Sequence, residues 1–504
     1  MHPFADSPAS PRETAANSLH QLNFDNTFAR LPQDFHSPQQ PTPLFYPYLV
    51  SFNPAAAELI DLDRAESERP DFAVHFSGNR LPQGAEPISM LYAGHQFGHY
   101  VQQLGDGRAI LLGEVRNRAG ELWDVQLKGA GLTPYSRQGD GRAVLRSTIR
   151  EYLCSEAMHG LGIPTSRALC ITGSDEEVYR EQIETAAVLT RLAPSHVRFG
   201  SFEVFFHRGQ HAEITKLADY VIARHFPSLA HAPDKYAVLL DEVTHRTARL
   251  MAQWKAVGFA HGVMNTDNMS ILGITLDYGP FGFMEAYDPG FVCNHSDHYG
   301  RYAFDQQPNI ALWNLTRLAH ALSPLVPEWE ARAVLDGYAP AFYERYIRLM
   351  GEKLGLRDAG EPEVPLIASL LEFMEESHVD YSNFFRALGN FDSAPDARND
   401  ALRDQFLERE VFDAWARAYR ARLDLEGVDD ATRKRRMDRV NPKYILRNHL
   451  AQAAIERATA HRDYSEIDRL LALLARPFDE QPGMEDYAKP APAGAPSIEV
   501  SCSS

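Results

Sequence analysis

Residues 261–279 hold three oxygen-bearing side chains at a spacing that suits a divalent metal ion. Asp267 and Asn268 are adjacent, the apolar run at residues 269–276 predicts a strand, and Asp277 then enters a turn. Carboxylate and amide oxygens are the ligands that Mg²⁺ prefers, and a short hairpin would fix the separation of two such ligands. The alternative is an ordinary hairpin in which Asp and Asn serve only as turn residues.

The order of these residues is typical of the metal-binding loops of protein kinases, with one exception. A kinase places its catalytic Asp directly after a His-Arg or His-Gly pair, but Val263 follows His261-Gly262 here and cannot accept a proton. Asp267 is the nearest carboxylate along the chain. Two interpretations follow: a kinase-like protein without catalysis, or an enzyme whose catalytic carboxylate lies at a different position from that of a kinase.

Groups that could bind phosphate precede this stretch in the order found in kinases. Gly105 and Gly107 form a turn before a predicted β-hairpin at residues 109–128, and Lys128 ends its second strand. Glu151 lies on the next predicted helix, where a kinase places the Glu that holds its phosphate-binding Lys. A Lys and a Glu on successive elements are a common coincidence, so the inference depends on the order of all these features.

Three arginines add positive charge to the same region. Arg108 follows the glycine-rich turn, Arg191 ends a predicted strand, and Arg198 lies in the segment after it. For each arginine alone, a surface salt bridge is the alternative. Together with Lys128 they suit gripping the terminal phosphates of a nucleotide as a leaving group, because arginine binds phosphate through two parallel donors.

The predicted elements divide the chain into four parts. A strand-rich segment at residues 86–206 precedes a helix-rich segment at residues 207–400, which contains the catalytic and metal-binding loops. We expect residues 1–85 to be an extension packed on the core. We expect residues 401–504 to be a C-terminal helical extension with a flexible tail that ends in Cys502. This organisation predicts an α+β class and a bilobal, protein-kinase-like fold with N-terminal and C-terminal extensions.

The composition excludes several classes of protein. The 504 residues carry 50 basic and 68 acidic side chains, and the net charge of −18 argues against binding to nucleic acid or to acidic membranes. No run approaches the roughly 18 apolar residues of a membrane span, and residues 1–17 lack the pattern of a secretory signal. Four scattered cysteines are too few for a disulfide framework or a zinc site. We therefore expect a cytoplasmic protein, and a monomer.

Several longer stretches resemble the selenoprotein O (SelO) family, and the resemblance covers nearly the whole chain. That family is kinase-like in fold. The resemblance implies a protein adenylyltransferase that binds ATP flipped relative to kinases, transfers AMP to Ser, Thr or Tyr hydroxyls of proteins, and releases pyrophosphate. The stretches are residues 23–26 (Asn-Phe-Asp-Asn), 92–98 (Tyr-Ala-Gly-His-Gln-Phe-Gly), 104–109 (Leu-Gly-Asp-Gly-Arg-Ala), 127–137 (Leu-Lys-Gly-Ala-Gly-Leu-Thr-Pro-Tyr-Ser-Arg), 261–268 (His-Gly-Val-Met-Asn-Thr-Asp-Asn) and 501–504 (Ser-Cys-Ser-Ser).

The resemblance also implies roles for individual residues. Lys128 and Glu151 would form the ion pair, Asn268 and Asp277 would hold Mg²⁺ or Mn²⁺, and Asp267 would accept the proton. Nucleotide binding would involve Gly105, Gly107, Arg108, Lys128, Asp140, Gly141, Glu151, Arg191, Arg198 and Asp277.

A regulatory pairing of Cys502 with Cys293 is implied by the same resemblance, because family members in eukaryotes carry selenocysteine at the position of Cys502. The alternative is two free thiols in a cytoplasmic protein.

Three other activities stay open at this point. Transfer of UMP from UTP with Mn²⁺ is implied for related family members. A true protein kinase would use Asp267 as its base and would move the γ-phosphate of ATP. A nucleotide-binding scaffold without turnover is suggested by Val263.

Overall fold

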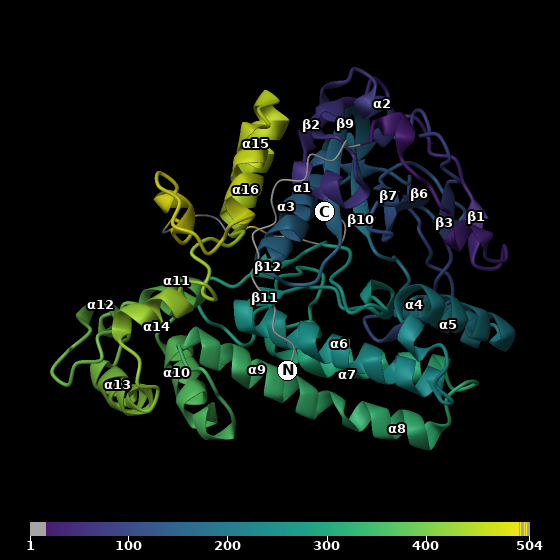
Figure 1. The fold of residues 1–504 in the computed structure, drawn as a ribbon. Coiled ribbons are helices and arrows are strands. Elements are labelled where there is room, and N and C mark those ends of the chain that lie inside the picture. The colour runs from purple at the N-terminus through teal and green to yellow at the C-terminus, as the bar shows by residue number, and fades with distance from the viewer. Residues whose placement is uncertain (1–16, 493, 495–497, 499, 501–504) are drawn as a thin grey trace.

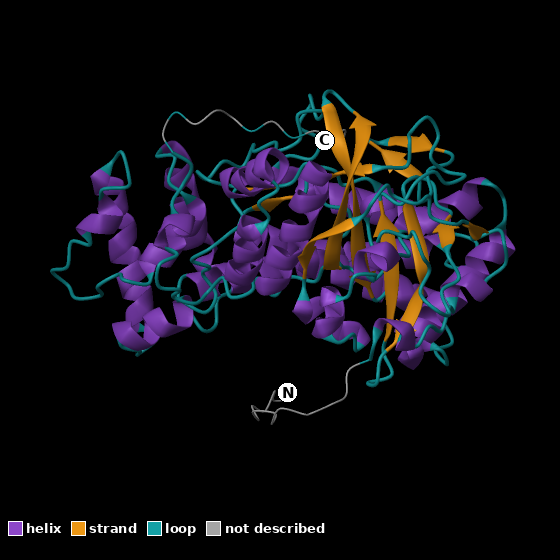
Figure 2. Cartoon of the chain, turned by 90° about the horizontal axis from the view of Figure 1, so that it is seen from above, coloured by secondary structure: helices purple, strands orange, loops and turns teal. Residues whose placement is uncertain are grey.

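An eight-stranded antiparallel sheet organises the N-terminal part of the chain in the computed structural model, which describes residues 17–492, 494, 498 and 500 (Figure 1). The strand order is β1-β3-β6-β7-β10-β9-β2, and β8 pairs with β10. Figure 2 shows these strands gathered in one half of the molecule. The strands are β1 (His36–Pro38), β2 (Tyr48–Phe52), β3 (Ile88–Met90), β6 (Ala109–Arg116), β7 (Leu122–Lys128), β8 (Ala143–Val144), β9 (Arg167–Tyr179) and β10 (Ile183–Ala193).

Both faces of the sheet are covered by hydrophobic clusters. Successive side chains of a strand point to opposite faces, so neighbouring residues of one strand belong to different clusters. In β10, Leu189 belongs to the hydrophobic cluster that includes helix α3 (Leu145–Gly160). The neighbouring Val188 belongs to a second cluster, which includes α2 (Phe72–Phe76). A sheet covered on both faces is a rigid support for side chains at its strand ends.

Helices make up most of the chain after the sheet (Figure 1). Near the C-terminus, α15 (Asn448–His461) and α16 (Ser465–Leu474) return to pack on α3. Gly160 allows this approach, because a Cβ there would lie 2.0 Å from the carbonyl oxygen of Leu474. The other helices are α1 (Pro54–Ala57), α4 (Phe199–His207), α5 (His211–His225), α6 (Lys235–Val257), α7 (Gln307–Ala321), α8 (Glu328–Asp336), α9 (Tyr338–Lys353), α10 (Val364–Glu376), α11 (Tyr381–Leu388), α12 (Asp400–Arg403), α13 (Arg409–Asp424) and α14 (Asp430–Met437).

Helix α6 delivers the chain to the predicted metal-binding loops. It ends at Gly258, whose φ of +72° is the left-handed conformation that commonly terminates helices. Strand β11 (Phe259–Ala260) follows and pairs with β12 (Gly282–Phe283), so the chain between them is closed as a loop. The turn η6 (Thr266–Asn268) lies within that loop.

The predicted α+β class is confirmed by the antiparallel sheet and the many helices. The predicted hairpin is present as β6 and β7, and Glu151 lies on α3 as expected. The bilobal, kinase-like arrangement and the division into four parts stay predictions. Within the described part of the chain, no helix combines the length and the apolar character needed to cross a membrane.

The strand predicted for residues 269–276 is wrong. This segment makes only isolated bridges, among them Met269 to Thr275 and Ser270 to Arg198. Met269 and Thr275 pair within the segment itself, and its outside partners, Arg198 and Thr165, come from different parts of the chain, so no continuous ladder forms. The apolar side chains of the segment are buried. Isolated backbone bridges, rather than a neighbouring strand, hold the segment in place.

Candidate active site

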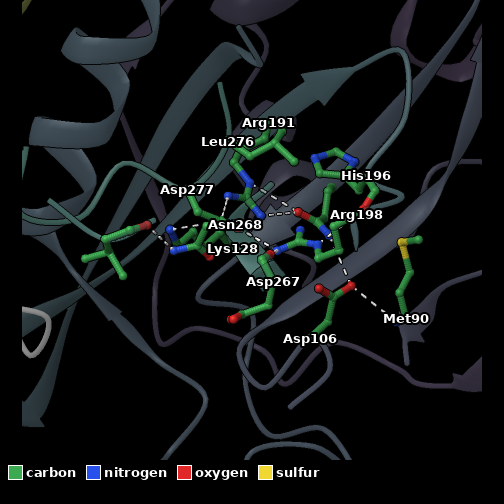
Figure 3. Close-up of polar contacts among 12 residues, drawn as sticks. Met90, Asp106, Lys128, Arg191, His196, Arg198, Asp267, Asn268, Leu276 and Asp277 are labelled. Carbon is green, nitrogen blue, oxygen red and sulfur yellow. Dashed lines mark hydrogen bonds and ion pairs between the residues drawn. The ribbon is translucent and has the colours of Figure 1, made fainter. Parts of the chain in front are cut away.

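A cavity of about 470 Å³ lies where the sheet meets the loops that follow α6, and its size suits a small molecule. Figure 3 shows charged side chains from the sheet and from these loops pointing toward one another. All of the predicted site residues line this cavity except Glu151, which is buried and contacts Lys128. The lining members are Gly105, Gly107, Arg108, Lys128, Asp140, Gly141, Arg191, Arg198, Asp267, Asn268 and Asp277.

The predicted glycines allow two loops to pack against each other beside the cavity. Gly105 (φ +71°) and Gly141 (φ +73°) both adopt the left-handed backbone conformation. A Cβ on Gly105 would lie 2.5 Å from the ring of Tyr135, and a Cβ on Gly141 would lie 2.1 Å from the backbone of Gly131. A Cβ on Gly107 would lie 2.9 Å from the carbonyl oxygen of Tyr135. These glycines are therefore needed for loop packing, whatever their contacts with a ligand.

Strand periodicity places Gln126, Lys128 and Arg191 on one face of the sheet. Gln126 and Lys128 are two residues apart on β7, and Arg191 pairs with Gln126 across to β10. Arg191 Nε donates to Gln126 Oε1 at 3.1 Å. Glu151, from α3, accepts from Arg191 Nη1 at 3.0 Å and from Lys128 Nζ. One buried carboxylate thus holds two cations, whereas the sequence predicted only its pairing with Lys128.

Asp277 connects these cations to Arg198. Asp277 Oδ1 accepts from Arg191 Nη1, Oδ2 accepts from Arg198 Nη1 at 2.7 Å, and Lys128 Nζ lies 3.6 Å from Oδ1. Arg198 is the residue before α4, and its Nη1 also donates to the carbonyl of Asp267 at 2.7 Å. The carboxylate of Asp277 therefore links the sheet, the start of α4 and the loops after α6.

Burial and charge act in opposite directions on the pKa values of this cluster. Burial would raise the pKa of Asp277, but Arg191, Arg198 and Lys128 outweigh it and hold that pKa well below its usual range. Burial lowers the pKa of Lys128, and Glu151 opposes this effect only in part. Asp277 is therefore ionised at neutral pH and offers a charged oxygen ligand to the cavity.

The turn η6 presents Asp267 and Asn268 in different directions. Asn268 Nδ2 donates to the carbonyl of Val263 at 3.0 Å, so the amide oxygen is the end able to bind a cation. Asp267 is only 7% exposed, and Gln96 Nε2 donates to its Oδ2 at 3.3 Å. Its Oδ1 is buried and accepts no hydrogen bond from the described residues. Burial raises the pKa of Asp267 to about 7.

The donor atoms of Asn268 and Asp277 fit Mg²⁺ or Mn²⁺, because both residues supply hard oxygen ligands to the same cavity. Two other groups of side chains in the described chain could hold a metal ion, and neither lines this cavity. They are His20, Asp71 and His75, and His95, Glu203 and His207.

Comparison with known proteins places most of the chain in one family. A family model described as "Protein adenylyltransferase SelO" matches residues 18–475. The chain belongs to the SelO family. It is 61% identical to "Protein nucleotidyltransferase YdiU" of Thiobacillus denitrificans and 58% identical to the protein of that name from Myxococcus xanthus. Each match spans 487 residues, 97% of this chain and 100% of the relative. The predicted family and the predicted enzyme class, a nucleotidyltransferase, are confirmed.

In this SelO-family chain the cavity also contains groups that sequence reasoning missed. Arg198 stacks over the ring of Tyr92, with 4.4 Å between Cζ and the ring centre. Asp106 is buried, and its Oδ2 accepts from Met90 N at 3.2 Å and Gln126 Nε2 at 3.1 Å. Burial raises the pKa of Asp106. Tyr92 and Asp106 both lie in stretches that carry the resemblance, which is the signal that could have found them.

Asp140 stands apart from the cluster around Asp277, because its carboxylate pairs with Arg180 instead. Arg180 donates to it through Nη1 at 2.7 Å and through Nη2 at 2.9 Å. Both residues line the cavity, where Asp140 balances the charge of Arg180.

The predicted pairing of Cys293 with Cys502 stays a prediction, because Cys502 lies outside the described residues. Cys293 is buried in the loop after β12. The backbone N–H of His295 donates to the carbonyl of Val500 at 2.9 Å, so the chain two residues before Cys502 lies beside that loop.

Proposed function

We propose that this chain transfers AMP from ATP to Ser, Thr or Tyr hydroxyls of protein substrates and releases pyrophosphate. The observation that carries the proposal is the convergence of Arg191, Arg198 and Lys128 on Asp277 inside the cavity. A kinase holds the phosphates with one such Lys. Three converging cations suit a pyrophosphate leaving group, whose negative charge develops as its bond to the α-phosphorus breaks.

The proposed framework is kinase-like and bilobal. Its N-lobe at residues 86–206 would contribute Lys128, Arg191 and Arg198, and its C-lobe at residues 207–400 would contribute the loops of η6. Residues 1–85 and 401–504 would be extensions of these lobes. We expect this enzyme to act in the cytoplasm as a monomer on protein substrates, without nucleic acid or a membrane.

Each predicted site residue has a role in the proposed reaction. Lys128, Arg108, Arg191 and Arg198 would neutralise the β- and γ-phosphates, with Glu151 fixing Lys128 and Arg191. Asp267 would accept the proton of the acceptor hydroxyl while the hydroxyl oxygen bonds to the α-phosphorus and the bond to pyrophosphate breaks. Asn268 and Asp277 would hold Mg²⁺ or Mn²⁺, which supplies positive charge to the phosphates when bound. Gly105, Gly107, Asp140 and Gly141 would shape the nucleotide pocket.

Three alternatives use the same residues. UMP transfer would keep the phosphate contacts and change only the base of the nucleotide. A kinase would use Asp267 as its base and would expose the γ-phosphate, which the three converging cations disfavour. A scaffold would bind nucleotide without turnover, and only Val263 suggests it.

One labelling experiment separates these activities. The protein is incubated with a protein substrate and Mg²⁺ or Mn²⁺, and with ATP labelled at the α- or the γ-phosphorus, or with α-labelled UTP. Protein-bound label from α-labelled ATP alone supports the proposal. Label from γ-labelled ATP means a kinase, stronger label from UTP means UMP transfer, and no label means a scaffold. The Asp267→Ala variant, prepared in parallel, shows whether any transfer belongs to this chain rather than to a contaminant.

A further inference from the structure

A closed ring of hydrogen bonds lies directly behind the turn that carries Asp267. Glu203, on α4, is 1% exposed, and its Oε1 lies 2.5 Å from Nδ1 of His95, on β4 (Gly94–Gln96). Its Oε2 accepts from the hydroxyl of Thr266, in η6. The same hydroxyl oxygen accepts from the backbone N–H of His95 at 2.7 Å. Both oxygens of a buried carboxylate are thus used to join a strand to a turn, which compensates its burial.

The side chains of β4 alternate in direction, so the two faces of this strand contact different residues. His95 reaches Glu203, whereas Gly94 and Gln96 face Asp267. Gln96 Nε2 donates to Asp267 Oδ2 at 3.3 Å. A Cβ on Gly94 would lie 3.0 Å from Asp267 Oδ1 and 3.1 Å from its Cβ, so the carboxylate packs on the bare backbone of Gly94.

Helix α4 is held against the same strand and the same turn. Ala93 N donates to Gly200 O at 3.1 Å, and Phe199 N donates to Met269 O at 2.9 Å. A Cβ on Gly200 would lie 2.1 Å from Ala93 O, so this approach requires glycine. Glu203 therefore projects from an anchored helix turn.

Asp267 itself has few direct restraints. One hydrogen bond of 3.3 Å reaches its carboxylate, and Oδ1 accepts none from the described residues. The direction of this carboxylate consequently depends on the turn beneath it and on the packing surface of β4. The ring of Glu203, His95 and Thr266 joins the turn to β4.

We propose that Glu203 is a positioning residue for Asp267, acting through Thr266 and His95. This inference rests on the proposed function, in which Asp267 accepts the proton of the acceptor hydroxyl. A displacement of about 1 Å at a reacting group costs on the order of 100-fold in rate. The ring should therefore affect turnover far more than nucleotide binding, because none of its three members lines the nucleotide cavity.

A metal ion is the competing explanation for this cluster. His207 lies one helical turn after Glu203, and the ligand atoms of His95, Glu203 and His207 lie within 4.8 Å of one another. The hydrogen bonds favour positioning, since both oxygens of Glu203 already have protein partners, whereas His207 is exposed. The experiment therefore includes His207→Ala and measures the metal content of the purified protein.

The test compares matched variants of the full chain. Thr266→Val removes the hydroxyl at constant size, Thr266→Ser keeps the hydroxyl, and Glu203→Gln removes the charge. Glu156→Gln is the control, because Glu156 is also buried and paired, with Arg167 at 2.8 Å. The measurements are kcat and KM for AMP transfer, the Kd of Mg²⁺-ATP, the unfolding midpoint and the content of bound metal.

We expect Thr266→Val and Glu203→Gln to lower kcat by about 10- to 100-fold while the Kd for ATP changes by less than about twofold. Thr266→Ser should restore kcat to within about threefold of wild type, and His207→Ala and Glu156→Gln should leave it within that range. If Glu203→Gln does not fold, the pair of Thr266 variants still decides the question.

Three results would overturn the inference, and each can be distinguished from failure of the proposed function. If the wild type is active and Thr266→Val has an undiminished kcat, Glu203 does not position Asp267 through Thr266. Equal losses of kcat and ATP affinity mean a general structural role. Loss of a stoichiometric metal ion in Glu203→Gln and His207→Ala means a metal site instead. A wild type that transfers no α-label refutes the proposed function itself, before any variant is compared.

Discussion

Replacing Asp277 tests the proposed metal site and the charge cluster around it together. Its carboxylate accepts from Arg191 and from Arg198, whose side chains are 3% and 2% exposed. Lys128 Nζ lies 3.6 Å away. In Asp277→Ala the proposed metal site loses its charged ligand, and two buried guanidinium groups lose a shared counter-ion. We therefore expect two effects, one on turnover and one on stability.

The size of each effect follows from the burial of the groups involved. Removing one partner of a buried ion pair costs about 3–5 kcal/mol, because the remaining charge stays desolvated. Glu151 still pairs with Arg191 at 3.0 Å, so we expect a loss near the lower end, about 3 kcal/mol in the free energy of unfolding. For turnover we expect a loss of at least about 1,000-fold, since both the proposed metal ligand and the arrangement of the cations proposed to bind phosphate are disturbed.

The assay combines AMP transfer over a range of Mg²⁺ concentrations with unfolding in the presence and absence of ATP and Mg²⁺. At a ligand concentration 100 times its Kd, wild type should gain about 2.7 kcal/mol of stability. In Asp277→Ala, adding Mg²⁺ to ATP should give no further gain. Asp413→Ala is the control, because it breaks a partly exposed ion pair with Arg403 away from the cavity and should keep turnover and its metal dependence. Metal-dependent turnover of Asp277→Ala within about tenfold of wild type would refute the assignment.

Two further predictions concern a buried lysine and a loop glycine. Burial lowers the pKa of Lys353 from 10.5 to about 7. Between these pH values the folded protein therefore binds fewer protons than the unfolded chain. The stability of the protein should consequently rise as the pH increases from 7 to 10. The penalty below pH 7 is at most about 5 kcal/mol, and the rings of Tyr381 and Phe385 offset part of it. Urea unfolding at pH 7 and pH 9 should show this rise in wild type and not in Lys353→Met, and equal pH slopes would contradict it. Gly141→Ala should raise the KM for ATP about tenfold, because the new Cβ would lie 2.1 Å from Gly131 and displace the loop. Gly120→Ala is its matched control, with the same left-handed backbone but no atom within 4 Å, and a similar rise there would exclude loop packing as the cause.

Local patterns were sufficient to predict the elements that carry the site. Alternation and turn residues predicted β6 and β7, and the helical period placed Glu151 on α3. The pairing of Lys128 with Glu151 did not follow from periodicity: it was expected from the kinase order of the motifs and from the family resemblance. The predictions of β6, β7 and α3 succeed because strand and helix periodicity depend on neighbouring residues only.

The partners of Arg191 could not be predicted in the same way. Gln126 is 65 residues away and Asp277 is 86 residues away, so both contacts depend on strand register and on the packing of loops against the sheet. The error at residues 269–276 has a related cause. An apolar run indicates burial, and only tertiary structure shows whether a neighbouring strand is available.

The adjacency of Asp267 and Asn268 has a geometric explanation. A 3₁₀ turn has three residues per turn, so successive side chains leave it about 120° apart. In η6, Asp267 faces Gly94 and Gln96 of β4, whereas Asn268 turns toward the carbonyl of Val263. One turn can therefore carry the proposed proton acceptor and a proposed metal ligand at neighbouring positions. Val263 contributes only its backbone oxygen to Asn268. Because Asp267 is the proposed proton acceptor, the proposed mechanism needs no carboxylate at the position where a kinase places its base.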